Sequence, residues 1–269
     1  MIRQANHISC LPLEGCSFNA MVPTPFVHYE LRTFDLERAA TFYSKLFDWE
    51  LREVAGSRWF FRGDQAQAEL AALPARARIL GAPAHWLGHL GVPSIENAVN
   101  QWLEHGAQLR GEIRRESGGD RAVLRDPHGA MIGLHSGAAS VDAAAVVWHE
   151  LNTTDLAGAW STYAKLCGWE DLGVSDFGPP LGAYQRFCSW GYGSADGGMV
   201  ASARLPGVHT HWLYYFAVTD LKLAIDGVWR EGGEVFKGPL RSENGDEFAV
   251  CHDTEGAAFG LRMREKRPL

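Results

Sequence analysis

Two side chains that can exchange protons lie two positions apart near the start of the chain. His28 and Glu30 stand in the run FVHYEL, residues 26–31, whose valine, tyrosine and leucine have good strand propensity. Because side chains alternate along a strand, His28 and Glu30 share one face of it. An imidazole is the usual acid–base group near neutral pH. The sequence therefore offers His28 and Glu30 as candidate catalytic residues.

This segment belongs to a longer stretch that occurs twice. Residues 26–50 read FVHYELRTFDLERAATFYSKLFDWE, and residues 147–170 read VWHELNTTDLAGAWSTYAKLCGWE. In each copy an extended run leads to a capping aspartate and then to apolar residues at helical spacing, which predicts helices over 35–47 and 155–167. The residues that recur 120 positions apart are Glu30 and Glu150, Asp35 and Asp155, Tyr43 and Tyr163, and Trp49 and Trp169. Such a repeat fixes the architecture.

A second pair of similar segments follows each copy of the first. Both open on His-Trp-Leu, at residues 85–87 and 211–213, and continue into a predicted helix that stops at glycine. Each then ends in two strands joined by a turn with an aspartate and a glycine, as in the run Asp-Pro-His-Gly at 126–129. The chain therefore consists of four similar strand–helix–strand units, and the predicted fold class is α+β.

These units resemble those of the vicinal oxygen chelate superfamily, which includes glyoxalase I, the extradiol dioxygenases and the bleomycin- and fosfomycin-resistance proteins. The resemblance spans residues 25–265 and rests on the helix pattern D-L-x-x-A-x-x-F/Y-Y, the D-P-x-G turn and the opening W-x-E-L-x-T-x-D. It is strongest to tandem glyoxalase-like members. It implies four βαβββ modules that form two bowl-shaped domains, at residues 22–140 and 141–269, after an N-terminal extension at 1–21.

The resemblance also implies where chemistry would lie in the first half. Metal-dependent members hold a divalent metal on the inner face of the sheet with His, Gln or Glu side chains from the first and last strands of each unit. Leu87 and Gly133 stand at two of these positions in the first half and cannot supply a ligand. The polar residues at or beside the four positions are His28, Glu30, Glu69, His89 and His135.

The corresponding positions of the second half are poorer in ligands. Trp148, Leu213 and Gly260 occupy three of them, so we expect no metal in this half. Glycine at both 133 and 260 is expected to open space on the inner face, which favours a pocket over a coordination sphere. The residues predicted to bind a ligand are Glu69, His89, His135, Trp148, Glu150, Tyr215 and Arg262.

Several of these residues also have a purely structural interpretation. His85 and His211 recur before tryptophan, which indicates a buried ring that donates to a backbone carbonyl. Glu30 and Glu150 recur as well, and could accept hydrogen bonds between units, because a buried carboxylate is costly unless it is paired. Two further residues, Cys167 and Cys251, are expected to pack in the core.

Composition narrows the class of partner. The formal charge of −7 over 269 residues argues against nucleic acid or an anionic membrane, and no apolar run approaches the length of a membrane span. Five cysteines without a C-x-x-C motif indicate a reducing, cytoplasmic setting. We expect a small-molecule ligand or substrate and a monomer or homodimer.

Three functional interpretations follow from these residues. The first is a metal-independent protein of resistance or sequestration that encloses an aromatic or cationic compound. The second is a metal-free enzyme in which His28 or Glu30 acts as acid or base. The third, the alternative, is a lyase, isomerase or dioxygenase that uses a divalent metal on His28, Glu69 and His89 or His135; no cofactor is firmly indicated, and this metal is not favoured. We expect any proton transfer in the first half, and binding in either half.

Overall fold

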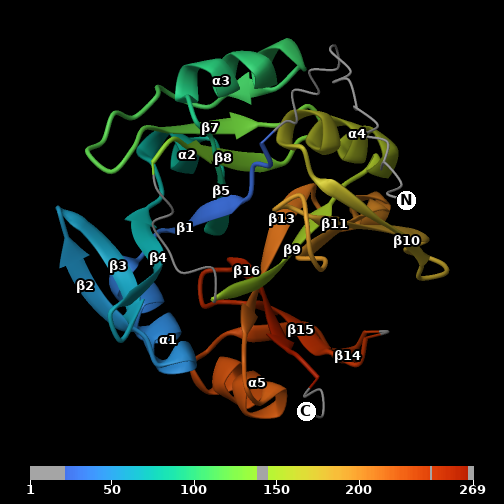
Figure 1. Cartoon of the computed structure of the whole chain (residues 1–269). Helices are drawn as coiled ribbons and strands as arrows, with labels where there is room; N and C mark the ends of the chain where they lie inside the picture. Colours follow the sequence, from blue (N-terminus) through green and yellow to red (C-terminus); the bar gives the residue numbers. More distant parts are fainter. Residues whose placement is uncertain (1–21, 138–144, 243, 266–269) are drawn as a thin grey trace, which may run out of the picture.

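The computed structural model describes residues 22–137, 145–242 and 244–265, and consists of two eight-stranded sheets with helices outside them (Figure 1). The first half contains β1 (Phe26–Thr33), α1 (Leu36–Phe47), β2 (Glu50–Val54), β3 (Ser57–Arg62), β4 (Gln65–Ala72), α2 (Ala75–Ile79), β5 (His85–Gly91), α3 (Ile95–Glu104), β6 (Gln108–Leu109), β7 (Arg121–Arg125) and β8 (Met131–His135). The second half contains β9 (Val146–Asn152), α4 (Leu156–Cys167), β10 (Glu170–Asp176), β11 (Ala183–Cys188), β12 (Gly197–Val200), the 3₁₀ helix η1 (Ala201–Arg204), β13 (His211–Ala217), α5 (Leu221–Arg230), β14 (Glu234–Arg241), β15 (Glu247–His252) and β16 (Ala258–Met263).

The two sheets have the same topology. The strand order is β2-β3-β4-β1-β5-β8-β7-β6 in the first sheet and β10-β11-β12-β9-β13-β16-β15-β14 in the second. In each sheet the first strands of two units pair antiparallel at the centre, β1 with β5 and β9 with β13. The predicted α+β class and the four βαβββ modules are therefore confirmed. The exact domain limits stay a prediction, and both the extension at 1–21 and residues 138–144, where the two predicted domains meet, lie outside the described residues.

The predicted helices begin where the sequence places them. The side chain of Asp35 accepts hydrogen bonds from the backbone of the first turn of α1, and Asp155 does the same for α4. α1 ends at Asp48 and α4 at Gly168, both with left-handed backbone. None of the described helices combines the length and apolar character that crossing a lipid bilayer requires.

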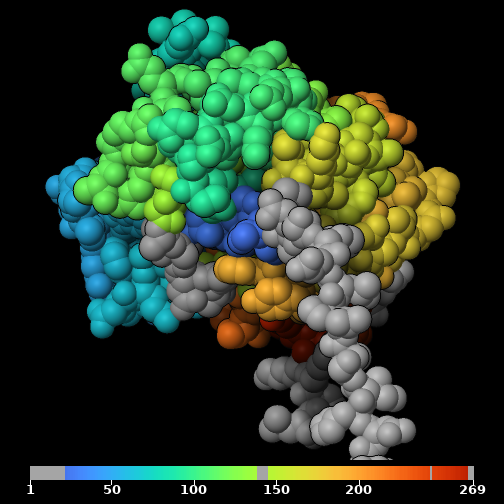
Figure 2. Space-filling view, turned by 45° about the horizontal axis from the view of Figure 1, so that its top comes forward, coloured from blue at the N-terminus to red at the C-terminus, as the bar shows by residue number. Residues whose placement is uncertain are grey.

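The helices of the two halves lie next to each other crosswise. α1 packs beside α5, and α3 lies beside α4, where the rings of Trp102 and Tyr163 are 5.3 Å apart (Figure 1). Figure 2 shows the second unit against the third, with the lead-in to β1 in the seam between them. In that seam the backbone of Thr24 donates to Cys167 and accepts from the indole of Trp169. The first unit therefore meets the fourth, and the second meets the third.

The recurring tyrosine and the turn aspartate join the two halves. The hydroxyl of Tyr43 on α1 donates to Asp253 in the other half, at 3.1 Å, and accepts from the indole of Trp86. Its counterpart Tyr163 donates to Asp126 at 2.8 Å and accepts from the indole of Trp212. All four partners are buried. The repeated Tyr and Asp are thus explained as a pair of equivalent contacts between halves.

One of the structural expectations is met in part and another in full. The ring nitrogen of His85 lies 2.8 Å from the backbone carbonyl of Pro83, and that of His211 lies 2.7 Å from the carbonyl of His209, but both residues are half-buried rather than buried. Cys167 and Cys251 are fully buried, with free thiols whose pKa burial raises.

Removal of the tyrosine hydroxyl should weaken the contact between the halves. We expect Tyr43→Phe and Tyr163→Phe each to lower the free energy of unfolding by about 1–3 kcal/mol, because an aspartate and an indole lose a buried partner. Urea unfolding at neutral pH measures this. Tyr192→Phe is the matched control, since Tyr192 is 76% exposed. If Tyr43→Phe were as stable as this control, the contact would not hold the halves together.

Candidate functional site

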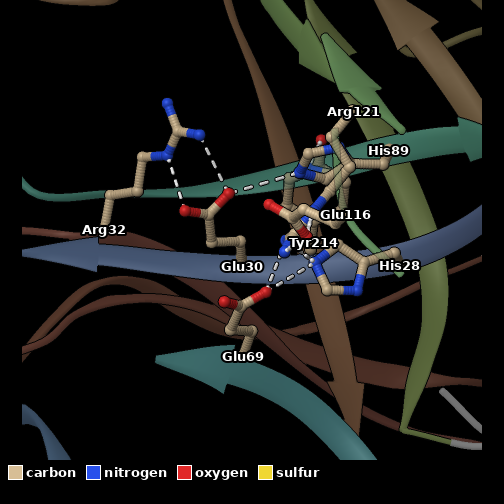
Figure 3. A network of polar contacts seen from close by, with 9 residues as sticks. His28, Glu30, Arg32, Glu69, His89, Glu116, Arg121 and Tyr214 are labelled. Atoms are coloured by element: carbon tan, nitrogen blue, oxygen red, sulfur yellow. Dashed lines mark hydrogen bonds and ion pairs between the residues drawn. The ribbon is translucent and has the colours of Figure 1, made fainter. Parts of the chain in front are cut away.

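Four central strands bring the predicted residues of the first half together. On β1, His28 lies opposite His89 of β5, and Glu30 lies beside Glu69 of β4 in the parallel pairing (Figure 3). His135 ends β8, and its ring centroid is 5.8 Å from that of His28. We call this inner face the first bowl. All five predicted residues therefore lie in one cluster, and each of them is buried.

A cation that the sequence did not indicate lies in the middle of this cluster. The guanidinium of Arg121, on β7, has Nη1 3.2 Å from Nε2 of His28 and 2.5 Å from the carboxylate of Glu69, while Nη2 donates to Glu116 (Figure 3). Nε2 of His28 is also 3.3 Å from Glu69. It accepts from Arg121 when unprotonated and donates to Glu69 when protonated, but cannot do both. Arg121 thus neutralises the buried carboxylate.

A second cation holds the other carboxylate of the first bowl. Glu30 accepts two hydrogen bonds from Arg32, at 2.9 and 3.0 Å, and lies 3.4 Å from Nε2 of His89. Burial raises the pKa of Glu30, but the hydrogen bond to His89 and the charge of Arg32 outweigh it and hold that pKa well below its usual value. A carboxylate with so low a pKa is a weak base at neutral pH.

Burial and ion pairing also shift the other titratable groups of the first bowl. The pKa of Glu69 is lowered to about 2: burial raises it, but the hydrogen bonds to His28 and Arg121 prevail. Burial lowers the pKa of His89 to about 3, against the raising effect of Glu30. At neutral pH this face therefore holds two charged carboxylates, two arginines and an uncharged His89.

Gly133 does not open a pocket in the first bowl. A side chain on Gly133 would come within 2.2 Å of the ring of His89, which lies across it on the neighbouring strand. The expectation of open space at this glycine is therefore wrong, because the imidazole of His89 takes the space. His28, Glu30 and His89 are each only 1% exposed.

The donor set of the first bowl does not fit a divalent metal. Two of the candidate ligands, His28 and Glu69, already bind the guanidinium of Arg121, and a dication between them would lie against this positive charge. Among the described residues, no group of three or more His, Cys, Asp or Glu side chains is arranged to hold a metal ion. The side chains that would bind a metal therefore bind the guanidinium of Arg121 instead.

In the second half, tyrosine hydroxyl groups rather than arginines pair with the glutamate at this strand position. Glu150, the counterpart of Glu30, accepts hydrogen bonds from Tyr184 at 3.0 Å and from Tyr215 at 3.4 Å. Tyr184 in turn accepts from the indole of Trp148 at 2.9 Å. Burial raises the pKa of Glu150, and the two tyrosines lower it only in part. We call this face of β9, β11, β13 and β16 the second bowl.

Glycines of the second bowl make room for aromatic rings. Gly198 lies beside Glu150, where the first half has Glu69, and a side chain there would come within 2.1 Å of the ring of Tyr184. Gly260 is filled in the same way by Tyr215, at 2.1 Å. Here too the expected free space at a glycine is taken by a neighbouring ring.

A hollow remains in the second bowl above these rings. It encloses about 80 Å³ and is open to solvent on one side. The predicted residues among its lining are Trp148, Glu150, Tyr215 and Arg262. Arg262 stacks over Trp148, with its guanidinium carbon 4.0 Å from the ring centroid, and forms a two-bond ion pair with Asp246. All four predicted residues of this half therefore line one hollow.

A larger open groove lies on the other side of the second sheet. It encloses about 830 Å³ between the start of α4, β10 and the loop before β11. It contains none of the predicted site residues, and Asp155 at its edge is the capping residue of α4. We assign no chemistry to it.

Sequence reasoning missed several residues of each bowl. In the first bowl these are Arg32 on β1, Arg121 on β7 and Glu116 in the loop before β7; in the second they are Tyr184 and Arg186 on β11, Asp246 in the loop before β15, and Phe248 on β15. Alternation along AYQRFC would have put Tyr184 and Arg186 on one face of β11. No comparable signal marks Arg121, because it follows a loop of irregular pattern.

The family of the first half follows from a direct match. Residues 26–134 match the model described as Glyoxalase/Bleomycin resistance protein/Dioxygenase superfamily. The first half of the chain belongs to this superfamily. The second half repeats the same strand order, so the glyoxalase-like fold occurs twice.

Relatives and solved structures agree with this membership. The chain is 27% identical over 245 residues to "Putative glyoxylase CFP32" of Mycobacterium bovis, an alignment that covers 86% of this chain and 92% of the relative. The structure is similar to the 2,3-dioxygenase LapB from Pseudomonas sp. KL28, with a TM-score of 0.63, 14% identity and coverage of 93% and 96%. It is also similar to the Mn(II)-bound glyoxalase from Novosphingobium aromaticivorans, with a TM-score of 0.59, 16% identity and coverage of 90% and 82%. At these identities the structures show the fold alone.

A change at Arg121 tests whether its charge excludes a metal. We expect Mn²⁺ or Zn²⁺ to leave the melting temperature of the unaltered protein unchanged. Arg121→Ala should lower stability by about 3–5 kcal/mol, because a buried carboxylate loses its partner, and the added dication should then recover part of that loss. The measurement is thermal unfolding with and without metal.

The control for this test removes the carboxylate as well. Arg121→Ala combined with Glu69→Gln should not respond to metal. Elemental analysis gives the opposing outcome: one equivalent of metal in the unaltered protein, lost on His28→Ala, would support a metalloenzyme. Two equivalents would contradict the expectation for the second half.

The lowered pKa values predict sensitivity to acid. His89 has a pKa of about 3 in the fold against 6.5 as a free side chain, and Glu69 about 2 against 4.5. Between the folded and unfolded pKa values the unfolded chain binds more protons than the folded one. The free energy of unfolding is therefore highest above pH 6.5 and decreases as the pH falls, by about 1 kcal/mol per pH unit for each group in its own range. Urea unfolding from pH 7 to pH 4 should show less slope in His89→Gln. The exposed His209→Gln serves as control, and an equal slope in both would contradict the prediction.

Proposed function

We propose that the protein binds a small molecule in the second bowl and needs no metal to do so. The hollow lined by Trp148, Glu150, Tyr215 and Arg262 carries this proposal. A ligand site is concave and largely apolar, with a few polar groups that converge on the ligand. The second bowl has aromatic walls, one carboxyl group and two arginines, Arg186 and Arg262, which is this combination.

The first bowl supports the proposal by contrast. Its charged side chains pair with one another: Arg121 binds Glu69, and Arg32 binds Glu30. The ring of His89 fills the space beside Gly133. A ligand would have to break a buried ion pair to reach His28, which costs several kcal/mol. Metal-free catalysis by His28 or Glu30 stays a prediction, and these contacts favour a structural role for both.

The relatives do not change this proposal. One solved neighbour is a Mn(II)-bound glyoxalase, but here the guanidinium of Arg121 contacts both His28 and Glu69, and Trp148 and Gly260 stand at the expected ligand positions of the second half. Glu150 is the better candidate for proton transfer, because its raised pKa leaves it closer to neutral pH than Glu30. Binding is nevertheless the function that this geometry supports best.

The test is a ligand screen with two variants. Ligand-observed NMR in the presence of EDTA, with a panel of one-ring and two-ring acids, amines and neutral compounds, should give hits with the unaltered protein. Trp148→Ala should abolish them and His28→Ala should retain them. Loss with His28→Ala alone would move the site to the first bowl, and loss with neither would move it out of both bowls.

A further inference from the structure

A second arginine in the hollow has one buried N–H group without a hydrogen-bond partner among the described residues. Arg186 on β11 lines the second bowl, and its Nε is buried without a hydrogen-bond partner among the described residues. The hydroxyl of Ser242, also in the lining, is buried and has no hydrogen-bond partner among the described residues. A buried guanidinium N–H without an acceptor costs free energy, which an acceptor on a ligand would recover.

The charges around the hollow favour an anion. Arg262 is neutralised by Asp246, and the burial of Glu150 favours its uncharged form. Lys237 on β14 lies close enough to act electrostatically on Glu150 and is exposed. Arg186 and Lys237 leave a positive balance even with Glu150 charged, so the expectation of a cationic ligand does not fit this hollow. A carboxylate matches the two parallel N–H groups of a guanidinium, so it is an anion that an arginine binds well.

The walls and the volume restrict the rest of the ligand. Trp148, Tyr184, Tyr215 and Phe248 line the hollow, and such rings pack well against a flat unsaturated ring. A cavity of roughly 150 Å³ is enough to enclose benzene, whereas this hollow encloses about 80 Å³ and is open on one side. It therefore admits one ring at most, with any further substituent directed to solvent.

We infer that the second bowl binds a small planar acid, a carboxylate on a single unsaturated ring, with the carboxylate on Arg186 and the ring among the aromatic walls. This inference rests on the proposed binding in the second bowl and adds the class of ligand. Ser242 supplies a hydroxyl that can donate to the same carboxylate.

The experiment compares three probes of one shape and different charge. Calorimetric titration in EDTA would use benzoate, neutral benzamide and cationic benzylamine. We expect benzoate to bind most tightly and benzylamine least. Arg186→Met should weaken benzoate about tenfold or more, because a charged hydrogen bond is lost, and should leave benzamide unchanged. Trp148→Ala should weaken both.

Two further variants separate the charge of Arg186 from its effect on folding. Arg186→Lys keeps the charge and should retain part of the benzoate affinity, and Arg76→Met, on the exposed surface of α2, should retain all of it. Circular dichroism shows whether Arg186→Met is folded. If it is not, the comparison of Arg186→Lys with the unaltered protein decides the question.

The outcomes that overturn the inference differ from those that overturn the proposed function. Equal affinity for benzamide and benzoate, both weakened by Trp148→Ala, would refute the ligand class and leave the binding site standing. Benzoate binding that Trp148→Ala leaves unchanged would refute both. If benzoate does not bind, the ligand class is refuted. The ligand screen described above then decides whether the second bowl binds any small molecule.

Discussion

The inner face of each sheet depends on how one buried carboxylate is compensated. Glu30 and Glu150 occupy the same position of the repeat on a central strand; Glu30 is fully buried and Glu150 is half-buried. Such a group must be paired or protonated. The first half uses arginine, which keeps Glu30 charged, and the second uses two tyrosine hydroxyls, which leave the pKa of Glu150 raised. The two bowls differ chemically because of this choice.

Each form of compensation decides how much room is left. Charged partners attract further charged partners: Glu30 and Glu69 hold Arg32 and Arg121 on the inner face and fill it, and Arg121 in turn binds Glu116 in the exposed loop before β7. Hydroxyl partners come on flat rings, which stand upright beside small residues such as Gly198 and Gly260 and leave a hollow between them. A glycine on the inner face therefore does not by itself indicate an open pocket, because a neighbouring ring occupies the place of the missing side chain.

The sequence predicts what depends on repetition and alternation. The 120-residue repeat gave the four modules and the helix starts at Asp35 and Asp155, and alternation placed His28 with Glu30. It could not predict contacts between strands that are distant in sequence. Arg121 meets His28 across 93 residues, and the site of Tyr184 depends on Gly198 of the next strand. Such contacts follow from sheet register, which the sequence alone does not fix.

The filled bowl also supports the open one. β1 carries His28 and Glu30 on its inner face, and between them Tyr29 points the other way, where its hydroxyl lies 2.7 Å from the imidazole of His149 on β9. Phe26 stacks on the same imidazole at 4.3 Å. Trp148 and Glu150 flank His149 and face the hollow. The ion pairs that fix β1 therefore help to fix the strand that presents Trp148 and Glu150, so the first half contributes to the geometry of the hollow in the second half.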